Sequence, residues 1–511
     1  MSALSQAHAK FKKFRYDLKN EKSTADKMSK REKLSINLVN SGGDNCMNTL
    51  KGSFFNVFLT TSLGLDPTTI ALLATVTTIL GYIKDPITAL IIESTRTKWG
   101  RFKPYVVICM PAVVLLNFAF MMNPFSDYQA KVIYVFTLEI LLSILSGFAG
   151  AWGNMKRCLS RDKKERENYY KMAKVFRDIT GCIPGIIPVL IDICKASGIS
   201  NRYVFMGMAI ILFPFSFYSA LQARHLRERV FLPPKASNFL SPKELAYNIK
   251  MVAKNKNAII LWWVNVGTIF NYVADIANAY VFMYCYQWYS LQTVMGVCGG
   301  IVSWVCIICS KKIFNKIGYK GVAIGYKILM ATSMIVLYCI GFGTQWYFWI
   351  GVCLCRMVGA SLEQLDGVAT DLFQTDVWDH YEWKTGVRNE TVTGLISGYV
   401  LMPISLLKPI FYAYVFNKIG FRPGENVVQP ASALQGLFFV YTIFIALGSI
   451  SDIFPYLLVR LNKKTMETVR ADLKAREIAK EAARQEGREL TTEEILAIHA
   501  QPPEEQTAQA A

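Results

Sequence analysis

Residues 81–104 read GYIKDPITALIIESTRTKWGRFKP and contain the end of an apolar segment followed by a basic turn. Lys84 and Asp85 are adjacent within the apolar part. A charged side chain at the centre of a membrane helix costs about 2.5–3.5 kcal/mol on insertion scales, so such residues are functional candidates by default. The turn is short, basic and centred on Gly100, which is typical of a cytoplasmic hairpin between two membrane spans.

The whole chain has the composition of a membrane protein. It has 511 residues, 52% of them hydrophobic and 18% charged, and its mean hydropathy is +0.27. A soluble chain of this length would divide into several domains and carry about 25% charged residues. Apolar segments long enough to cross a ~30 Å hydrocarbon layer recur throughout. We predict twelve spans, near residues 36–61, 67–93, 104–122, 130–155, 173–194, 203–223, 257–284, 291–309, 321–342, 346–372, 391–416 and 433–459.

The formal net charge of +19 is distributed along a bilayer rather than over one folded face. Of the 56 Lys and Arg residues, 44 lie in alternate loops on one side of the predicted spans, and five lie in the opposite loops. The positive-inside rule therefore places both termini in the cytoplasm. A nucleic-acid-binding module would gather its charge in one patch, so we expect membrane lipid and no nucleic acid as a partner.

The reactive residue types form no catalytic or metal-binding pattern. Cys306 and Cys309 make a C-x-x-C, but no His or second pair lies near them in the sequence, so we expect packing thiols and no metal site. No Ser–His or His–carboxylate arrangement is recognisable, which argues against an enzyme. We expect no cofactor apart from a coupling ion. The polar N-terminus predicts no cleaved signal peptide.

Polar side chains recur at helical spacing inside several predicted spans, where they must face a protein interior or an aqueous cavity. They are Asp44, Asn45, Asn48 and Lys51 in the first span, Asn271, Asp275 and Asn278 in the seventh, and Arg356, Glu363 and Asp366 in the tenth. An Asp44–Lys51 structural pair fits the first stripe as well as solute contact does. Arg356 likewise fits either a structural ion pair or a solute contact.

Two segments resemble the signatures of the glycoside–pentoside–hexuronide:cation symporters, a melibiose-permease-like branch of the major facilitator superfamily. The first is DP followed by TKWGRFKP (85–104), and the second is TDVWDHYEWKTGVRNE (375–390). The resemblance covers about residues 36–460. It implies an all-α membrane protein with twelve transmembrane helices in two six-helix bundles, the major facilitator fold.

The predicted organisation follows from the longest internal loop, which separates six spans from six. We expect a basic cytoplasmic arm (1–34), an N-terminal bundle (35–223), a cytoplasmic linker (224–256), a C-terminal bundle (257–460) and a charged cytoplasmic tail (461–511).

The resemblance also implies uptake of a sugar, glycoside or hexuronide by alternating access around a central cavity. Lys174 stands where the family has an arginine, and either Asp44 or Asn45 stands at its sugar-binding aspartate. Trp152 fits both stacking on a sugar ring and ordinary packing. The substrate-binding candidates are Asp44, Asn45, Asn48, Trp152, Lys174, Asn271, Asp275, Glu363 and Asp366. The cationic residues within the spans favour an anionic glycoside or hexuronide, unless neighbouring acids neutralise them.

The predicted coupling residues are Asp85, Lys84 and Lys51. Asp85 matches a cation-binding aspartate of the family, but the second carboxylate is replaced by Gly81 and the intervening amide by Lys84. We therefore expect a proton-coupled or facilitative transporter rather than a sodium-coupled one, in which the Lys84 ammonium or a proton on Asp85 replaces sodium.

The second signature predicts a cytoplasmic gate that closes by ion pairing, with a static loop staple as the alternative. The candidate gate residues are Arg101 from the first signature and Asp376, Asp379, Glu382 and Arg388 from the second.

The leading prediction is a monomeric secondary transporter of a small sugar-like solute in the cell inner membrane. A lipid or amphiphile carrier of the same superfamily branch is one alternative, and it requires an apolar lateral cavity. A non-transporting membrane sensor built on the transporter scaffold is another.

Overall fold

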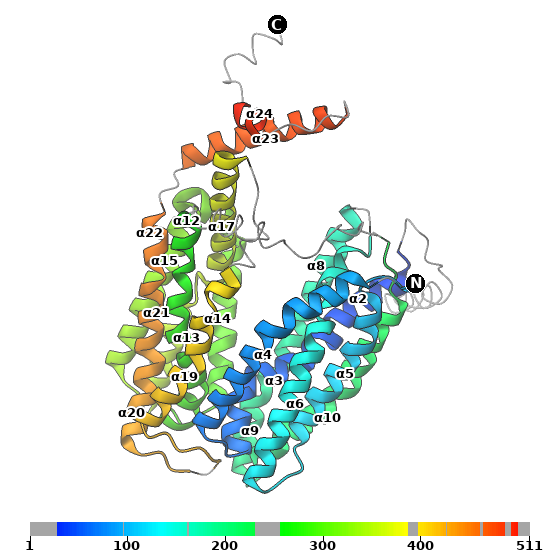
Figure 1. Cartoon of the computed structure of the whole chain (residues 1–511). Helices are drawn as coiled ribbons and strands as arrows, with labels where there is room; N and C mark the ends of the chain where they lie inside the picture. The colour runs from blue at the N-terminus through cyan, green and yellow to red at the C-terminus, as the bar shows by residue number, and fades with distance from the viewer. Residues whose placement is uncertain are drawn as a thin grey trace, which may run out of the picture. The chain divides into compact units, whose positions relative to one another are not determined.

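The computed structural model describes residues 28–95, 97–160, 163–229, 256–386, 397–425, 427–459, 463–485 and 492–498. Within these ranges the regular structure is helical, and an isolated bridge between Thr97 and Gly100 is the single extended pairing (Figure 1). The chain forms two compact units. Unit 1 comprises Met1–Phe239, Trp288–Thr293 and Pro409–Ala433, and unit 2 comprises Leu240–Gln287, Val294–Lys408 and Leu434–Ala511.

The helices up to residue 225 belong to unit 1. They are α2 (Lys30–Leu38), η1 (Val39–Cys46), α3 (Met47–Val57), η2 (Phe58–Ser62), α4 (Pro67–Ser94), α5 (Lys103–Met122), α6 (Tyr128–Ala149), α7 (Ala151–Arg157), α8 (Lys163–Cys182), η3 (Ile183–Ile186), α9 (Ile187–Ala196), α10 (Asn201–Leu221) and η4 (Gln222–His225).

The later helices lie mainly in unit 2, although α14, α19 and α20 each cross a unit boundary. They are α12 (Lys256–Trp262), α13 (Val264–Tyr280), η5 (Val281–Cys285), α14 (Ser290–Ile308), α15 (Ser310–Ile340), α16 (Trp346–Gly359), α17 (Glu363–Thr385), α19 (Met402–Lys418), α20 (Ala431–Phe439), η6 (Val440–Phe444), α21 (Ile445–Ser451), α22 (Ile453–Leu458), α23 (Lys463–Gln485) and α24 (Thr492–Ala497).

Ten helical segments in the described ranges are long and apolar enough to cross a membrane, and each coincides with a predicted span. They are Pro67–Ile92, Lys103–Met122, Tyr128–Arg157, Asn168–Ala196, Asn201–His225, Ile259–Cys285, Ser290–Ile308, Lys312–Ile340, Trp346–Thr385 and Ala431–Leu458. The chain is therefore a multi-pass membrane protein, and the ten segments are consistent with twelve spans.

The first and eleventh predicted spans are outside this group for different reasons. Residues 36–61 lie in an unbroken helical run from Lys30 to Ser62, but its polar stripe lowers the hydropathy. Part of the run is the π-helix η1, where Gly42 and Gly43 allow α10 to approach closely. The eleventh span begins in residues 387–396, which lie outside the described ranges.

Two charged, glycine-containing segments are helical over most of their length. Residues 310–321 belong to α15, which bends at Gly318, where φ is +71° and a side chain would be strained. The second signature begins inside α17, which continues to Thr385 and ends at Gly386 in a left-handed conformation. Asp376, Asp379 and Glu382 of that signature therefore lie on a helix.

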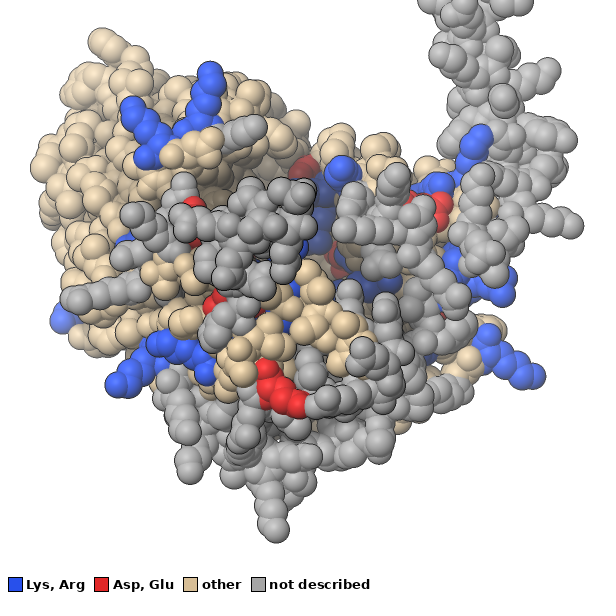
Figure 2. Space-filling view, turned by 90° about the horizontal axis from the view of Figure 1, so that it is seen from above, with Lys and Arg blue, Asp and Glu red and all other residues tan. Residues whose placement is uncertain are grey.

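The described surface carries more Lys and Arg than Asp and Glu side chains on the face seen from above in Figure 2. In unit 1 the basic turn between α4 and α5 carries exposed Lys98. In unit 2 the helix α23 contributes Arg470, whose side chain is about half exposed. Both of these residues lie outside the ten spans.

Candidate functional site

The polar stripe of the first predicted span is tied to its neighbours in unit 1. Asp44 lies in η1, with its Oδ2 3.8 Å from Nη1 of Arg177, and its side chain is 32% exposed. Asn45 is buried and donates to the backbone carbonyl of Arg177 over 3.0 Å. Asn48 donates to the Asp44 carbonyl (2.6 Å) and accepts from Asn117 (2.7 Å). The stripe therefore joins η1 to α8 and α3 to α5. Asp44 is half-buried and Asn48 is exposed, so these two remain the accessible polar groups of the stripe.

Lys51 and Lys84, two further cations within the N-terminal spans, each pair with a single acid. Lys51 forms an ion pair with Glu139 of α6, and its ammonium lies 4.9 Å from the centre of the Phe120 ring. The Nζ of Lys84 lies 2.6 Å from Oδ1 of Asp85, although these residues are adjacent on α4. The predicted Asp44–Lys51 pair does not form, because Glu139 takes Lys51 as its partner.

Trp152 and Lys174 occupy opposite environments in unit 1. The Trp152 side chain is 2% exposed, and its indole N–H donates to Asn40 (3.4 Å). The ammonium of Lys156 lies 5.4 Å from the ring centre. Packing therefore accounts for this tryptophan, whereas Lys174 is exposed on α8.

Unit 2 contains a broken membrane span. The helix α16 ends at Gly359, a tight turn covers residues 360–362, and α17 starts at Glu363. A Cβ at Gly359 would meet the Ser333 hydroxyl at 2.5 Å, so glycine allows α15 to pack against the break. Broken spans are where solute and ion sites form in many membrane carriers, because the backbone polar groups of the break can face a cavity.

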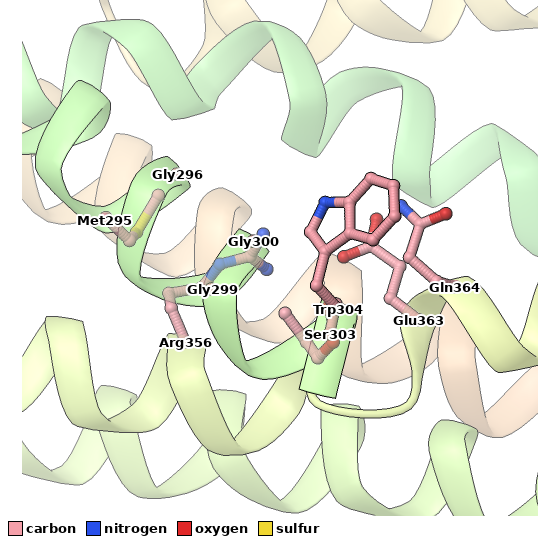
Figure 3. A pocket seen from close by; sticks show the side chains of 10 residues that line it. Met295, Gly296, Gly299, Gly300, Ser303, Trp304, Arg356, Glu363 and Gln364 are labelled. Atoms are coloured by element: carbon pink, nitrogen blue, oxygen red, sulfur yellow. Dashed lines mark hydrogen bonds between the residues drawn. The ribbon is translucent and has the colours of Figure 1, made fainter. Parts of the chain in front are cut away.

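A pocket of about 190 Å³ lies at this break, between α14, α16 and α17 (Figure 3). Three glycines of α14 at helical spacing form its wall, and Ser303 of the same helix donates to the Ala360 carbonyl over 2.6 Å. The exposed indole of Trp304 lies beside Glu363 and Gln364, while Arg356 lies nearer the glycines (Figure 3). The pocket thus combines a flat apolar face with a cation, a carboxylate and an amide.

Arg356 is the central cation of this pocket. Its Nη1 lies 3.6 Å from the Met330 sulfur, and its buried Nε has no hydrogen-bond partner among the described residues. The charge of Asp275 interacts electrostatically with Arg356 and with Glu363. Asp275 and Glu363 are both exposed, and Glu363 lines the pocket together with Arg356.

A second charged cluster lies deeper in unit 2. The Nζ of Lys327 on α15 is 3.4 Å from Oδ2 of Asp366 and 3.3 Å from Oδ2 of Asp452, which lies between α21 and α22. The exposed fractions of the three side chains are 15%, 12% and 4% in that order. We call these residues the Lys327 triad.

Two glycines make room for the polar side chains between α13 and α21. A Cβ at Gly267 would lie 2.3 Å from Oδ1 of Asp452, and a Cβ at Gly448 would lie 2.3 Å from Oδ1 of Asn271. Gly267 of α13 thus makes room for Asp452, which follows α21, and Gly448 of α21 makes room for Asn271 of α13. The predicted candidate Asn271 therefore packs between helices next to the Lys327 triad.

The basic turn of the first signature is held by a carboxylate that follows α10. Glu228 accepts hydrogen bonds from the backbone N–H groups of Arg101 (2.9 Å), Phe102 (2.9 Å) and Lys103 (2.7 Å). A Cβ at Gly100, where φ is +115°, would lie 2.5 Å from this carboxylate. The glycine and the helix N-terminus together explain why the turn binds an acid.

The predicted gate acids of α17 contact the C-terminal tail helix. Asp376 accepts from Nη2 of Arg470 on α23 over 2.5 Å, and this hydrogen bond raises the pKa of Arg470. The charge of Asp379 also interacts with Arg470. Glu382 supplies the carbonyl that caps α17, and Arg388 lies outside the described residues.

The sequence did not indicate four residues that the structure adds to the candidate sites. Trp304 and Gln364 line the pocket, and Lys327 and Asp452 complete the triad. The glycines at positions 296, 299 and 300, followed by Trp304 on the same helical face, were a usable signal. The triad had none, because spacing does not reveal which helices meet.

The sequence profile of the family described as MFS/sugar transport protein matches residues 38–463. The chain belongs to this family. MFS stands for the major facilitator superfamily, whose members are transporters. As an MFS sugar-transport protein, the chain has curated relatives at low identity. It is 23% identical over 458 residues to a proposed 2,3-dihydroxypropane-1-sulfonate exporter of Salmonella typhimurium, covering 87% of this chain and 96% of the relative.

Two further relatives are named as symporters. The chain is 24% identical over 433 residues to the uncharacterized symporter YjmB of Bacillus subtilis, covering 81% of this chain and 88% of the relative. It is 21% identical over 284 residues to YagG of Escherichia coli, a proposed glycoside/cation symporter, covering 53% and 59%.

Solved structures share the fold of this MFS protein. A mutant of the nucleoside transporter NupG superimposes with a TM-score of 0.57 at 12% identity, covering 83% of this chain and 98% of that one. A bacterial homologue of the human peptide transporters PepT1 and PepT2 gives 0.55 at 10% identity, covering 83% and 97%. The all-helical architecture is therefore the MFS fold.

Proposed function

We propose that the protein is a secondary transporter of a sugar, glycoside or hexuronide across the cell inner membrane, coupled to protons rather than sodium. It works by alternating access and makes or breaks no covalent bond. The observation that carries this proposal is the pocket at the broken span between α16 and α17, with Arg356, Glu363, Gln364 and Trp304 around it.

The lining of this pocket suits a polyhydroxylated solute. A carboxylate and an amide accept and donate several hydrogen bonds in fixed planes, so neighbouring hydroxyl groups can be bound in one orientation. The Trp304 indole supplies a large flat face for the C–H side of a sugar ring. A volume of about 190 Å³ fits one small ring better than a drug-sized ligand, which needs about 300–1,000 Å³.

The guanidinium of Arg356 supports an acidic member of this solute class. Its buried Nε is unpartnered among the described residues, and a carboxylate or sulfonate can accept from two guanidinium N–H groups at once. The relative from Salmonella typhimurium is named for a sulfonate that carries two hydroxyl groups. Glu363 and Asp275 offset part of the positive charge, so hydroxyl groups of the solute are needed as well.

The coupling proposal rests on Lys84 and Asp85 of α4. The Lys84 ammonium contacts Asp85 at 2.6 Å and lies 3.2 Å from the position of a Cβ at Gly147 of α6. It therefore fills the space beside this carboxylate with a fixed positive charge. A hard metal cation requires several oxygen ligands and is repelled by that ammonium. Lys51 is already paired with Glu139, so it supplies no open site for a cation.

The proposed orientation follows the charge distribution. Both termini are in the cytoplasm, because the basic loops lie on one side of the spans. The protein functions as a monomer, with the predicted bundles (35–223 and 257–460) as the moving parts.

Uptake into proteoliposomes tests the transport function. The purified protein is supplied with labelled sugars, glycosides, hexuronides and 2,3-dihydroxypropane-1-sulfonate, and proton and sodium gradients are imposed separately. We expect solute counterflow for at least one acidic solute, accumulation with the proton gradient, and loss of counterflow in Arg356→Gln. Fluxes equal to those of empty vesicles for the whole panel would overturn the proposal.

Lys84→Asn tests the coupling part. Restoring a neutral amide beside Asp85 removes the fixed cation and opens the carboxylate, so we expect uptake to become stimulated by sodium. Ion dependence unchanged from that of the native protein would refute this part and leave the transport function standing.

A further inference from the structure

The Lys327 triad has an unequal number of charges. One ammonium lies between two carboxylates, and all three side chains are largely buried inside the spans of unit 2. When both acids are ionised, the cluster carries one uncompensated negative charge. An isolated charge is expensive to keep in a low-dielectric interior, and buried groups neutralise themselves by binding a proton when no counter-ion is present.

The free oxygens of the triad support this reasoning independently. Each carboxylate directs its Oδ2 toward Lys327, whereas Oδ1 of Asp366 and Oδ1 of Asp452 are buried and have no hydrogen-bond partner among the described residues. Asp452 is 3% exposed. Unpartnered carboxylate oxygens in a buried site are acceptors that lack a donor, and a bound proton converts such an oxygen into a donor.

Oδ1 of Asp452 packs tightly against α13. A Cβ at Gly267 would lie 2.3 Å from this oxygen and 2.9 Å from the Gly448 carbonyl oxygen. The Gly448 carbonyl already accepts the backbone N–H of Asp452 over 3.0 Å. No donor reaches Oδ1 among the described residues, so this position favours a neutral, protonated carboxyl over a second bare charge.

We propose that the Lys327 triad is a proton-binding site, in which Asp366 and Asp452 together hold one proton while Lys327 neutralises the remaining carboxylate. Protonation makes the cluster neutral, and release of the proton leaves it with one negative charge. The role of this site in transport rests on the proposed function, but proton binding itself does not.

The groups around the triad are consistent with an acid-rich environment. The titratable and charged side chains that interact with it electrostatically are Tyr326 from α15, Glu363 from α17 and Tyr456 from α22, and the Thr370 hydroxyl of α17 also interacts with Asp366. The facing part of α13 contributes Gly267 and Asn271, which carry no charge. Arg356 of α16 interacts with Tyr326 and Asp275, so it belongs to the pocket rather than to the triad.

The triad suits a proton better than a metal cation. Both Oδ2 atoms face the Lys327 ammonium at 3.3–3.4 Å, so a metal ion at these oxygens would lie beside a positive charge. The packed glycine contacts at Oδ1 of Asp452 leave no room for a hydrated ion. A proton needs neither space nor a ligand shell.

Infrared difference spectroscopy on the purified, solute-free protein tests this proposal. The carboxylic-acid carbonyl band is recorded as the pH is varied over about pH 4 to 9, the range in which a buried carboxyl titrates. We expect a band that titrates in the native protein and is lost in Asp452→Asn, because Lys327 and Asp366 then form a neutral pair. Asp85→Asn is the matched control: it removes an acid that has its own ammonium, and the band should remain.

Lys327→Met keeps the test informative if Asp452→Asn fails to fold. Without the ammonium both acids favour the protonated form, so the band should grow and its midpoint should move to higher pH. A titrating band that is the same in the native protein and in both variants would overturn the proposal, as would a native protein with no such band. The readout needs no solute, so a transport assay that fails for every solute leaves this result unaffected.

Discussion

The two units of the protein handle buried charge differently. In unit 1, Lys51 pairs with Glu139, Lys84 pairs with Asp85, and Asp44 lies near both Arg177 and Lys156, so each of these acids has at least one cation. In unit 2, Lys327 faces two carboxylates at nearly equal distances. A matched pair is neutral and has no need of a mobile ion, whereas an unmatched acid acquires one. The difference assigns fixed charge to unit 1 and the exchangeable proton to unit 2.

The largest effect that separates the units is expected from Lys327→Met. Loss of one partner from a buried pair destabilises by about 3–5 kcal/mol. The two remaining acids bind protons more tightly in the folded than in the unfolded state, so stability should decrease as the pH rises. Thermal unfolding at several pH values measures this. The corresponding change in unit 1, Lys84→Met, should cost less, because the Asp85 side chain is 66% exposed. Equal destabilisation by the two variants would contradict the comparison.

A double substitution sharpens the contrast between a pair and a triad. Glu139→Gln alone leaves Lys51 uncompensated, and we expect a loss of about 3 kcal/mol. Adding Lys51→Met removes the orphaned cation, so most of the stability should return. In unit 2, Lys327→Met combined with Asp452→Asn still leaves Asp366 without a cation. A double-mutant cycle by thermal unfolding measures both couplings, and rescue of similar size in the two units would argue against an unmatched acid.

The fold was predictable because membrane spans have a strong local signal. Ten predicted spans coincide with helices, and the two signature motifs are sufficient to indicate the family. The break between α16 and α17 was not predicted. Residues 360–362 contain no proline, and the single glycine before them, Gly359, is too weak a signal for a helix end. Tertiary packing against Ser333 makes that glycine a helix end.

The site was predictable only where polar residues shared one helix. The stripes identified Asp275, Glu363 and Asp366, which the structure places beside Arg356 or Lys327. Lys327 is the one charged residue of the predicted span 321–342 and Asp452 is the one charged residue of the span 433–459, so no spacing marked them. Trp152 and Trp304 show the same limit: the first is buried and the second faces the pocket, which depends on packing and not on residue type.

A tryptophan in each unit gives a smaller, more specific test. Trp304→Ala removes the flat wall of the pocket, and an aromatic contact of about 0.5–1.5 kcal/mol corresponds to roughly a three- to tenfold weaker apparent affinity. Trp152→Phe should lower the melting temperature and leave the apparent affinity near that of the native protein. Titration of solute counterflow measures the affinities. A larger loss of affinity in Trp152→Phe than in Trp304→Ala would place the solute site in unit 1 and contradict the proposal.

The smallest effect is expected at the tail of unit 2. Arg470→Ala removes the hydrogen bond to Asp376, and a half-exposed ion pair contributes about 1 kcal/mol or less. The overall melting temperature should hardly change, while the released helix α23 should become more sensitive to limited proteolysis. Arg177→Ala in unit 1 is the control, since its ion pair does not involve the tail. Proteolysis at the native rate in Arg470→Ala would show that this contact does not hold α23.

The most direct measurement compares accumulation and counterflow in Asp452→Asn. Counterflow needs only solute binding and alternating access, whereas accumulation against a gradient needs the proton. We expect Asp452→Asn to retain counterflow in proteoliposomes and to lose accumulation driven by an imposed pH gradient. Accumulation at the native level in this variant would contradict the assignment of the exchangeable proton to the Lys327 triad.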